Sequence, residues 1–142
     1  MKFTNTVVIG RPTADVFAYL AELENIPRWN YAISETRKAG DGPVGVGARY
    51  VQQRTLPAPA QEEFEVVEFE AGRRLALDGR LGPFASRAAY VLEPVDGGTS
   101  LTNTMELRPS GLLRVAAPLA VAPIKAAVAR NLVVLKEILE NS

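Results

Sequence analysis

An asparagine, Asn131, falls on the apolar face of the amphipathic segment that ends the sequence. At about 100° per residue, the charged side chains between Lys125 and Glu140 gather on one side of a helix, and Asn131 lies among aliphatic side chains on the other. A buried amide without a partner costs roughly 1 to 3 kcal/mol. Asn131 is therefore a candidate for contact with a ligand, and the alternative is a hydrogen bond to Asn103, Tyr90 or the backbone.

Four further polar side chains fall on strand positions that alternation directs inward: Tyr50, Gln52, Tyr90 and Asn103. Sparse polar groups in an apolar pocket orient a ligand carbonyl or hydroxyl. A tyrosine can also serve as a general acid. The alternative is that these tyrosines only pack their rings and satisfy their hydroxyls. No catalytic residue is assigned.

The composition excludes several kinds of chemistry. The chain has no cysteine and no histidine, so disulfides, thiolate nucleophiles and Ser-His-Asp arrangements are ruled out. We expect no metal and no cofactor. Sixteen basic and sixteen acidic side chains cancel, so no global field draws the protein to nucleic acid or to an anionic membrane.

Two patterns could suggest other sites. The glutamates between Glu62 and Glu70 could form a paired-carboxylate or hard-cation site, but alternation sends them to both faces of a strand, and we interpret them as a solvated strand face. Glu63 or Glu65 opposite Arg54 or Arg87 would weaken that interpretation. The stretch GDGPVGVG, residues 40–47, lacks the lysine and hydroxyl of a phosphate-binding loop, so a turn is predicted.

The elements that would position these residues follow from periodicity. Residues 3–9 predict a strand, and 12–23 and 25–29 predict two short helices separated by Asn25 and Pro27, with Thr13 as a cap for the first. Six further strands follow as an antiparallel meander, with DGG at 96–98 as a hairpin signal. A long helix is predicted from Pro123 to Glu140, because Pro118 and Pro123 should break an earlier start.

The order of elements, one strand, two short helices, a meander and a final helix, resembles the START-like or Bet v-type superfamily. Within it the chain is similar to the polyketide cyclase/dehydrase and lipid-transport family, known as SRPBCC. The resemblance spans the chain and is carried by RPTADVFAYLAELENIPRWN, GPVGVGARY, YVLEPVDGGTSL and GLLRVAAPLA. It implies an α+β helix-grip fold, in which a curved seven-stranded antiparallel sheet surrounds the C-terminal helix. We expect residues 1–142 to form a single ligand-binding domain.

A strongly curved sheet cannot touch one helix along its full width, so we expect a cavity between them, open to a ligand. The residues predicted to line it come from a short helix, the strands and the final helix: Trp29, Tyr50, Gln52, Phe64, Val66, Leu77, Tyr90, Leu92, Asn103, Met105, Val128, Asn131 and Leu132.

The resemblance implies binding of a hydrophobic or aromatic small molecule, lipid-like or polyketide-like. The alternative is a polyketide cyclase or dehydratase that folds its substrate and polarises carbonyls. A third hypothesis is an interaction protein that resembles the helix-grip co-chaperones or the membrane-associated ubiquinone-binding relatives. This hypothesis requires an exposed apolar patch. With no secretory signal at residues 1–10, we expect a cytoplasmic monomer or homodimer, without nucleic acid and without stable membrane insertion.

Overall fold

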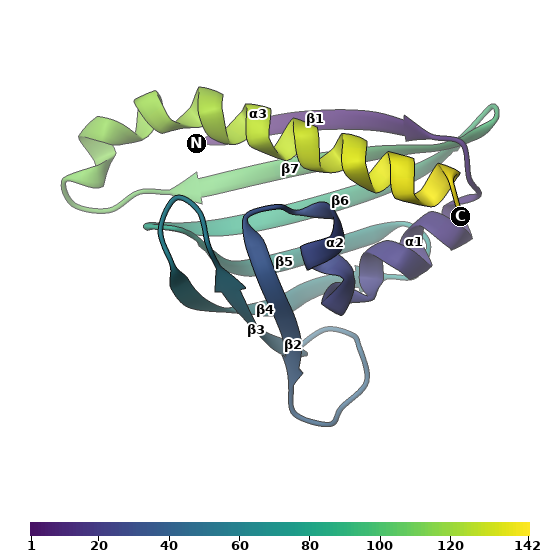
Figure 1. Cartoon of the computed structure of the whole chain (residues 1–142), viewed down its shortest axis with the longest axis horizontal. Coiled ribbons are helices and arrows are strands. Elements are labelled where there is room, and N and C mark those ends of the chain that lie inside the picture. The colour runs from purple at the N-terminus through teal and green to yellow at the C-terminus, as the bar shows by residue number, and fades with distance from the viewer.

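The computed structural model describes residues 1–142 and contains one antiparallel sheet with a long helix across it (Figure 1). The elements in chain order are β1 (Lys2–Ile9), α1 (Thr13–Ala21), the 3₁₀ turn η1 (Leu23–Asn25), α2 (Ile26–Trp29), β2 (Ile33–Ala39), β3 (Arg49–Arg54), β4 (Ala60–Glu70), β5 (Arg74–Leu81), β6 (Phe84–Val95), β7 (Gly98–Arg108) and α3 (Leu113–Glu140). The sheet order is β1-β7-β6-β5-β4-β3-β2, so β2 to β7 form a meander and β1 pairs with β7. The predicted helix-grip fold and its strands are confirmed.

The two short helices between β1 and β2 are also confirmed. α2 begins at Ile26 with Pro27 in its first turn, where the missing backbone donor has no intrahelical partner to lose. The predicted Thr13 cap is wrong, because Pro12 occupies the capping position of α1 and no side chain caps the helix. The chain therefore turns a corner at α1 and α2 and enters β2 beside Trp29.

The final helix begins ahead of its predicted start. α3 starts at Leu113 rather than near Pro123, and both Pro118 and Pro123 lie inside it. The prolines are exposed, as are Arg114 and Leu119, the residues four positions before them, so the carbonyl groups that lose a hydrogen bond can bind water. Figure 1 shows that this first part of α3 curves and extends past the end of β7.

The sheet bends around α3, and two irregularities help it to do so. The pairing register shifts between Ile33 and Glu35 in β2 and between Val66 and Glu68 in β4, and such bulges increase local bend and twist. The later part of α3 is fixed to the end of β1, because Lys136 Nζ donates to the Val8 carbonyl (2.6 Å). The earlier part has no comparable attachment to a strand end.

A glycine makes the close approach of β1 to the β6–β7 hairpin possible. A Cβ on Gly98 would lie 2.0 Å from the carbonyl oxygen of Ile9, a distance that no side chain can accept. The hairpin signal at 96–98 therefore has two uses: Gly97 takes a positive φ of 82°, and Gly98 leaves room for β1.

Candidate functional site

Two neighbouring spaces lie between the sheet and α3. The inner cavity has a volume of about 110 Å³ and is walled by α2, strands β3 to β7 and α3. The outer groove measures about 510 Å³ and runs between the α2–β2 turn, the β3–β4 loop, the β5–β6 turn and the first part of α3. The residues that line both spaces are Asn30, Arg54, Leu81, Val128 and Asn131. The groove and the cavity therefore adjoin.

Two small residues line the inner cavity. They are Gly79 in β5 and Ala88 in β6, and Ala88 pairs across the sheet with the larger Leu77 and Met105. A Cβ on Gly79 would lie 2.7 Å from the Cβ of Phe64, so β4 and β5 approach each other closely there. The hollow depends on side-chain size as well as on sheet curvature.

Nine of the residues predicted for the cavity line it: Trp29, Gln52, Phe64, Leu77, Tyr90, Met105, Val128, Asn131 and Leu132. The other predicted residues, Tyr50, Val66, Leu92 and Asn103, do not line it and are core positions with at most 2% of each residue exposed. The physical reason is packing, because these four side chains point inward but neighbouring side chains fill the space above them. The ring of Tyr50, for example, stacks on that of Phe64 with ring centroids 5.1 Å apart. Strand alternation predicts direction and cannot predict where along a strand the interior is empty.

Asn131 and Trp29 bring unpartnered polar atoms to the cavity wall. The Oδ1 atom of Asn131 and the Nε1 atom of Trp29 are buried and have no hydrogen-bond partner. None of the three alternative partners, Asn103, Tyr90 and the backbone, bonds to this oxygen of Asn131. Asn103 donates instead to the carbonyl of Ala89 at 3.2 Å. A ligand or a water molecule in the cavity would be able to satisfy both atoms.

Tyr90 contributes a phenol side chain to the wall of the inner cavity. Its ring meets Trp29 edge-on, with centroids 6.5 Å apart and an interplanar angle of 89°. Burial raises the pKa of the Tyr90 hydroxyl above its ordinary value. The phenol therefore stays protonated at neutral pH and can donate a hydrogen bond, whereas it cannot act as a phenolate base.

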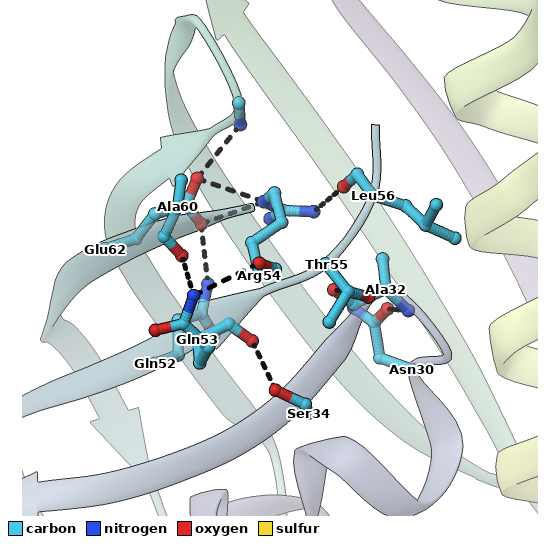
Figure 2. A network of polar contacts seen from close by, with 11 residues as sticks. Asn30, Ala32, Ser34, Gln52, Gln53, Arg54, Thr55, Leu56, Ala60 and Glu62 are labelled. Carbon is cyan, nitrogen blue, oxygen red and sulfur yellow. Dashed lines mark hydrogen bonds and ion pairs between the residues drawn. The ribbon is translucent and has the colours of Figure 1, made fainter. Parts of the chain in front are cut away.

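A buried ion pair lies where the cavity meets the groove (Figure 2). Arg54 Nε donates to both carboxylate oxygens of Glu62 at 3.0 Å, and only 8% and 4% of the two side chains are exposed. Gln52 Nε2 donates to Glu62 at 3.1 Å, the backbone N–H of Gly82 donates at 3.2 Å, and Arg54 Nη1 donates to the carbonyl of Leu56. The network ties β3 and β4 to the β5–β6 turn.

The buried network corrects the interpretation of the glutamate run. Glu63, Glu68 and Glu70 are exposed and Glu65 is half-buried, as a solvated face requires, but Glu62 is buried. Sequence reasoning missed the Arg54–Glu62 pair, although the signal was present: Glu62 shares the parity of Phe64, and Arg54 shares the parity of Tyr50 and Gln52. No group of three or more acidic side chains is placed to hold a metal ion.

Comparison with known proteins gives the family. The polyketide cyclase/dehydrase and lipid transport family matches residues 1–140, and the chain belongs to this family. A search of curated proteins found no match. Members of the family bind hydrophobic ligands or act as aromatase/cyclases.

Solved structures share the fold at low sequence identity. The protein TTHA0849 from Thermus thermophilus superposes with a TM-score of 0.80 at 15% identity, over 98% of this chain and 97% of that one. The Zhui aromatase/cyclase from Streptomyces sp. R1128 gives 0.77 at 11% identity, over 99% and 93%. The di-domain aromatase/cyclase StfQ of the steffimycin biosynthetic pathway gives 0.77 at 15% identity, over 99% of this chain and 50% of that one. At these identities the likeness shows the fold alone.

Proposed function

We propose that the protein binds an elongated hydrophobic or aromatic small molecule, with one end in the inner cavity and the body in the outer groove. The observation that carries the proposal is that the two spaces adjoin, with Asn30, Arg54, Leu81, Val128 and Asn131 lining both. Sites for small molecules commonly measure about 300 to 1,000 Å³. The groove lies in that range, whereas the cavity has room for about one ring or a short polar head group.

The polar atoms of the cavity favour a ligand with a carbonyl or hydroxyl at its inner end. The indole N–H of Trp29 can donate, the carboxamide oxygen of Asn131 can accept, and the neutral phenol of Tyr90 can do either. Arg54 and Glu62 satisfy one another, so together they present a nearly neutral surface at the junction. A hydroxylated or ketone-bearing hydrophobic molecule fits this set better than a pure hydrocarbon.

Native mass spectrometry of the purified protein, followed by thermal shift with fatty acids, flavonoids and aromatic polyketides, tests the proposal. We expect either a co-purified mass or a rise in Tm that increases with ligand concentration, since a ligand at a hundred times its Kd stabilises the folded state by about 2.7 kcal/mol. If no mass is bound and no compound raises Tm, the proposal is contradicted.

A matched pair of variants places the ligand. Ala88→Leu puts a larger side chain into the inner cavity, while Ala89→Leu makes the same change on the opposite face of β6. We expect only Ala88→Leu to abolish the ligand-induced shift. Equal loss in both variants would show that the shift does not report on the cavity.

A second candidate function, polyketide cyclisation or dehydration, is favoured by the buried donors beside the cavity. The phenol of Tyr90 and the guanidinium of Arg54 could polarise the carbonyls of a folded chain, and the amide of Asn131 could hold it in place. No histidine or unpaired carboxylate lies in the cavity to act as a base. Any catalysis would therefore depend on substrate folding and carbonyl polarisation.

The product distribution from a poly-β-ketone substrate tests this second candidate. We expect Tyr90→Phe and Asn131→Ala to change the ratio of cyclised products relative to the spontaneous reaction. Unchanged products with the wild type and both variants would exclude catalysis and would leave the binding proposal intact.

A further inference from the structure

The first part of α3 carries apolar side chains that nothing in the molecule covers. Leu112 is 91% exposed, and Val115 and Leu119 are each 83% exposed. These residues recur at three- and four-residue spacing, which places them on one side of the helix, and the exposed Ala122 and Ala126 continue the line. We call these five residues the α3 stripe.

The opposite side of the same turns is packed. Ala117 is buried in a small core with Phe3, Phe84, Met105 and Leu107, so this part of α3 is attached to the sheet. The stripe is consequently a second apolar face of a helix that already has one. By length and composition alone, α3 could even span a bilayer, although its later part is held in the core by Leu132, Leu135 and Leu139.

Positive charge accompanies the stripe. From residue 107 to residue 136 the chain contains five cations, Arg108, Arg114, Lys125, Arg130 and Lys136, and no acidic residue. Arg108 pairs with Glu106 and Lys136 with Glu140, whereas Arg114, Lys125 and Arg130 make no ion pair. The zero net charge of the whole chain therefore conceals a local excess of positive charge beside the stripe.

We infer that the α3 stripe docks on the surface of an anionic lipid bilayer. Exposed aliphatic side chains flanked by cations are the combination that binds the interface of such a membrane, where the apolar groups enter the acyl boundary and the cations meet lipid phosphates. A second copy of the chain fits less well, because a contact between two stripes would bring the unpaired cations of one copy close to those of the other. A nucleic acid would leave the aliphatic side chains without a partner.

Docking in this manner has a consequence for the groove. Ala120, Pro123, Ile124 and Ala127 of α3 line it, and they lie on the turns that carry the stripe. A membrane under the stripe is thus next to the groove wall, where a hydrophobic ligand could pass between bilayer and protein without crossing bulk water. The docking itself does not depend on the ligand, so the Ala88→Leu variant should still dock.

Co-sedimentation with phosphatidylcholine vesicles, with and without phosphatidylglycerol, tests the inference. We expect binding that requires phosphatidylglycerol and weakens with added salt. Val115→Ser with Leu119→Ser should lower the partition coefficient roughly tenfold or more. Arg114→Gln with Lys125→Gln should lower it roughly fivefold per cation removed.

Val46→Ser is the matched control, because Val46 is 69% exposed in the β2–β3 loop, on the far side of the molecule from the start of α3 (Figure 1). It should bind vesicles like the wild type. Absence of wild-type binding at low ionic strength, equal loss with Val46→Ser, or no loss with the stripe variant would overturn the inference. A wild-type dimer that the stripe variant converts to monomer, without vesicle binding, would show instead that a second copy covers the stripe.

Discussion

The interior between the sheet and α3 has two ends that differ in packing. At the packed end, Ile9, Leu20, Leu101 and Leu135 have at most 1% of their surface exposed. At the hollow end, the same sheet and the same helix enclose the inner cavity and the outer groove. Backbone architecture is therefore shared by both ends, and the side chains decide which end is core and which is a site.

The two ends also differ in the polar groups that they contain. The packed end is closed by α1 and by the later part of α3, which is bonded to β1 through Lys136. The hollow end contains the Arg54–Glu62 pair and the unpartnered atoms of Trp29 and Asn131. A core tolerates few such groups, because each buried polar atom without a partner costs free energy. Tyr19, Thr36, Tyr50 and Asn103 also carry buried polar atoms without a partner, so the hollow end is distinguished by its buried ion pair and by two unpartnered atoms that belong to cavity-lining residues.

The largest effect should come from breaking the ion pair at the hollow end. Arg54→Met leaves the Glu62 carboxylate buried without its partner, and we expect a loss of about 3 to 5 kcal/mol in the free energy of unfolding by urea denaturation. The double variant Arg54→Met with Glu62→Met should recover most of that loss. A double variant as unstable as the single one would show that the pair stabilises the fold beyond mutual neutralisation.

A leucine pair on α3 compares the two ends directly. Leu135→Ala, at a residue with no exposed surface, should lower the free energy of unfolding by about 2 to 5 kcal/mol. Leu119→Ala, the same change at an exposed position, should alter it by less than about 0.5 kcal/mol. Similar losses from both, measured by urea denaturation, would contradict the distinction between the core face of α3 at Leu135 and its uncovered face at Leu119.

Gly79→Ala tests whether glycine keeps the hollow end open. The added Cβ would meet the Cβ of Phe64 at 2.7 Å, and overpacking of this kind costs about 1 to 3 kcal/mol. We also expect weaker ligand binding by thermal shift, because Phe64 must move into the cavity. Gly45→Ala is the control, since no atom lies within 4 Å of the added Cβ. Normal ligand binding by Gly79→Ala would remove this glycine from the account of the cavity.

The smallest effect concerns the outer face of β5, the strand that contains Gly79. Arg87 donates to Asp78 at 2.6 and 2.8 Å, and this hydrogen bond holds the pKa of the Asp78 carboxyl below its ordinary value of 3.8. A lowered folded-state pKa stabilises the protein above pH 3.8, and that stabilisation is lost as pH falls through the folded-state pKa. Since both side chains are partly exposed, Asp78→Asn should cost less than about 1 kcal/mol at neutral pH.

Urea denaturation at neutral and at strongly acidic pH measures this difference. The gap between the wild type and Asp78→Asn should close in acid. A gap that persists there would assign the effect to packing rather than to charge.

The sequence predicts the packed end better than the hollow end. Alternation of apolar and polar residues placed the strands and directed Val66 and Leu92 into the core, because one face of each strand must be buried. The Arg54–Glu62 pair was missed, since a buried charge looks like a surface charge until its partner on the next strand is known. The early start of α3 was missed because the carbonyl groups of Arg114 and Leu119, which lose a hydrogen bond to Pro118 and Pro123, lie on exposed residues and can bind water.

The place of α3 in the chain has a consequence for biosynthesis. The helix is translated after every strand, and β1 cannot pair until β7 has emerged from the ribosome. At ordinary translation rates the inner face of the meander is therefore bare on the nascent polypeptide for a time on the order of seconds. During that interval its aliphatic residues are accessible to chaperones, and arrival of the final helix ends their exposure.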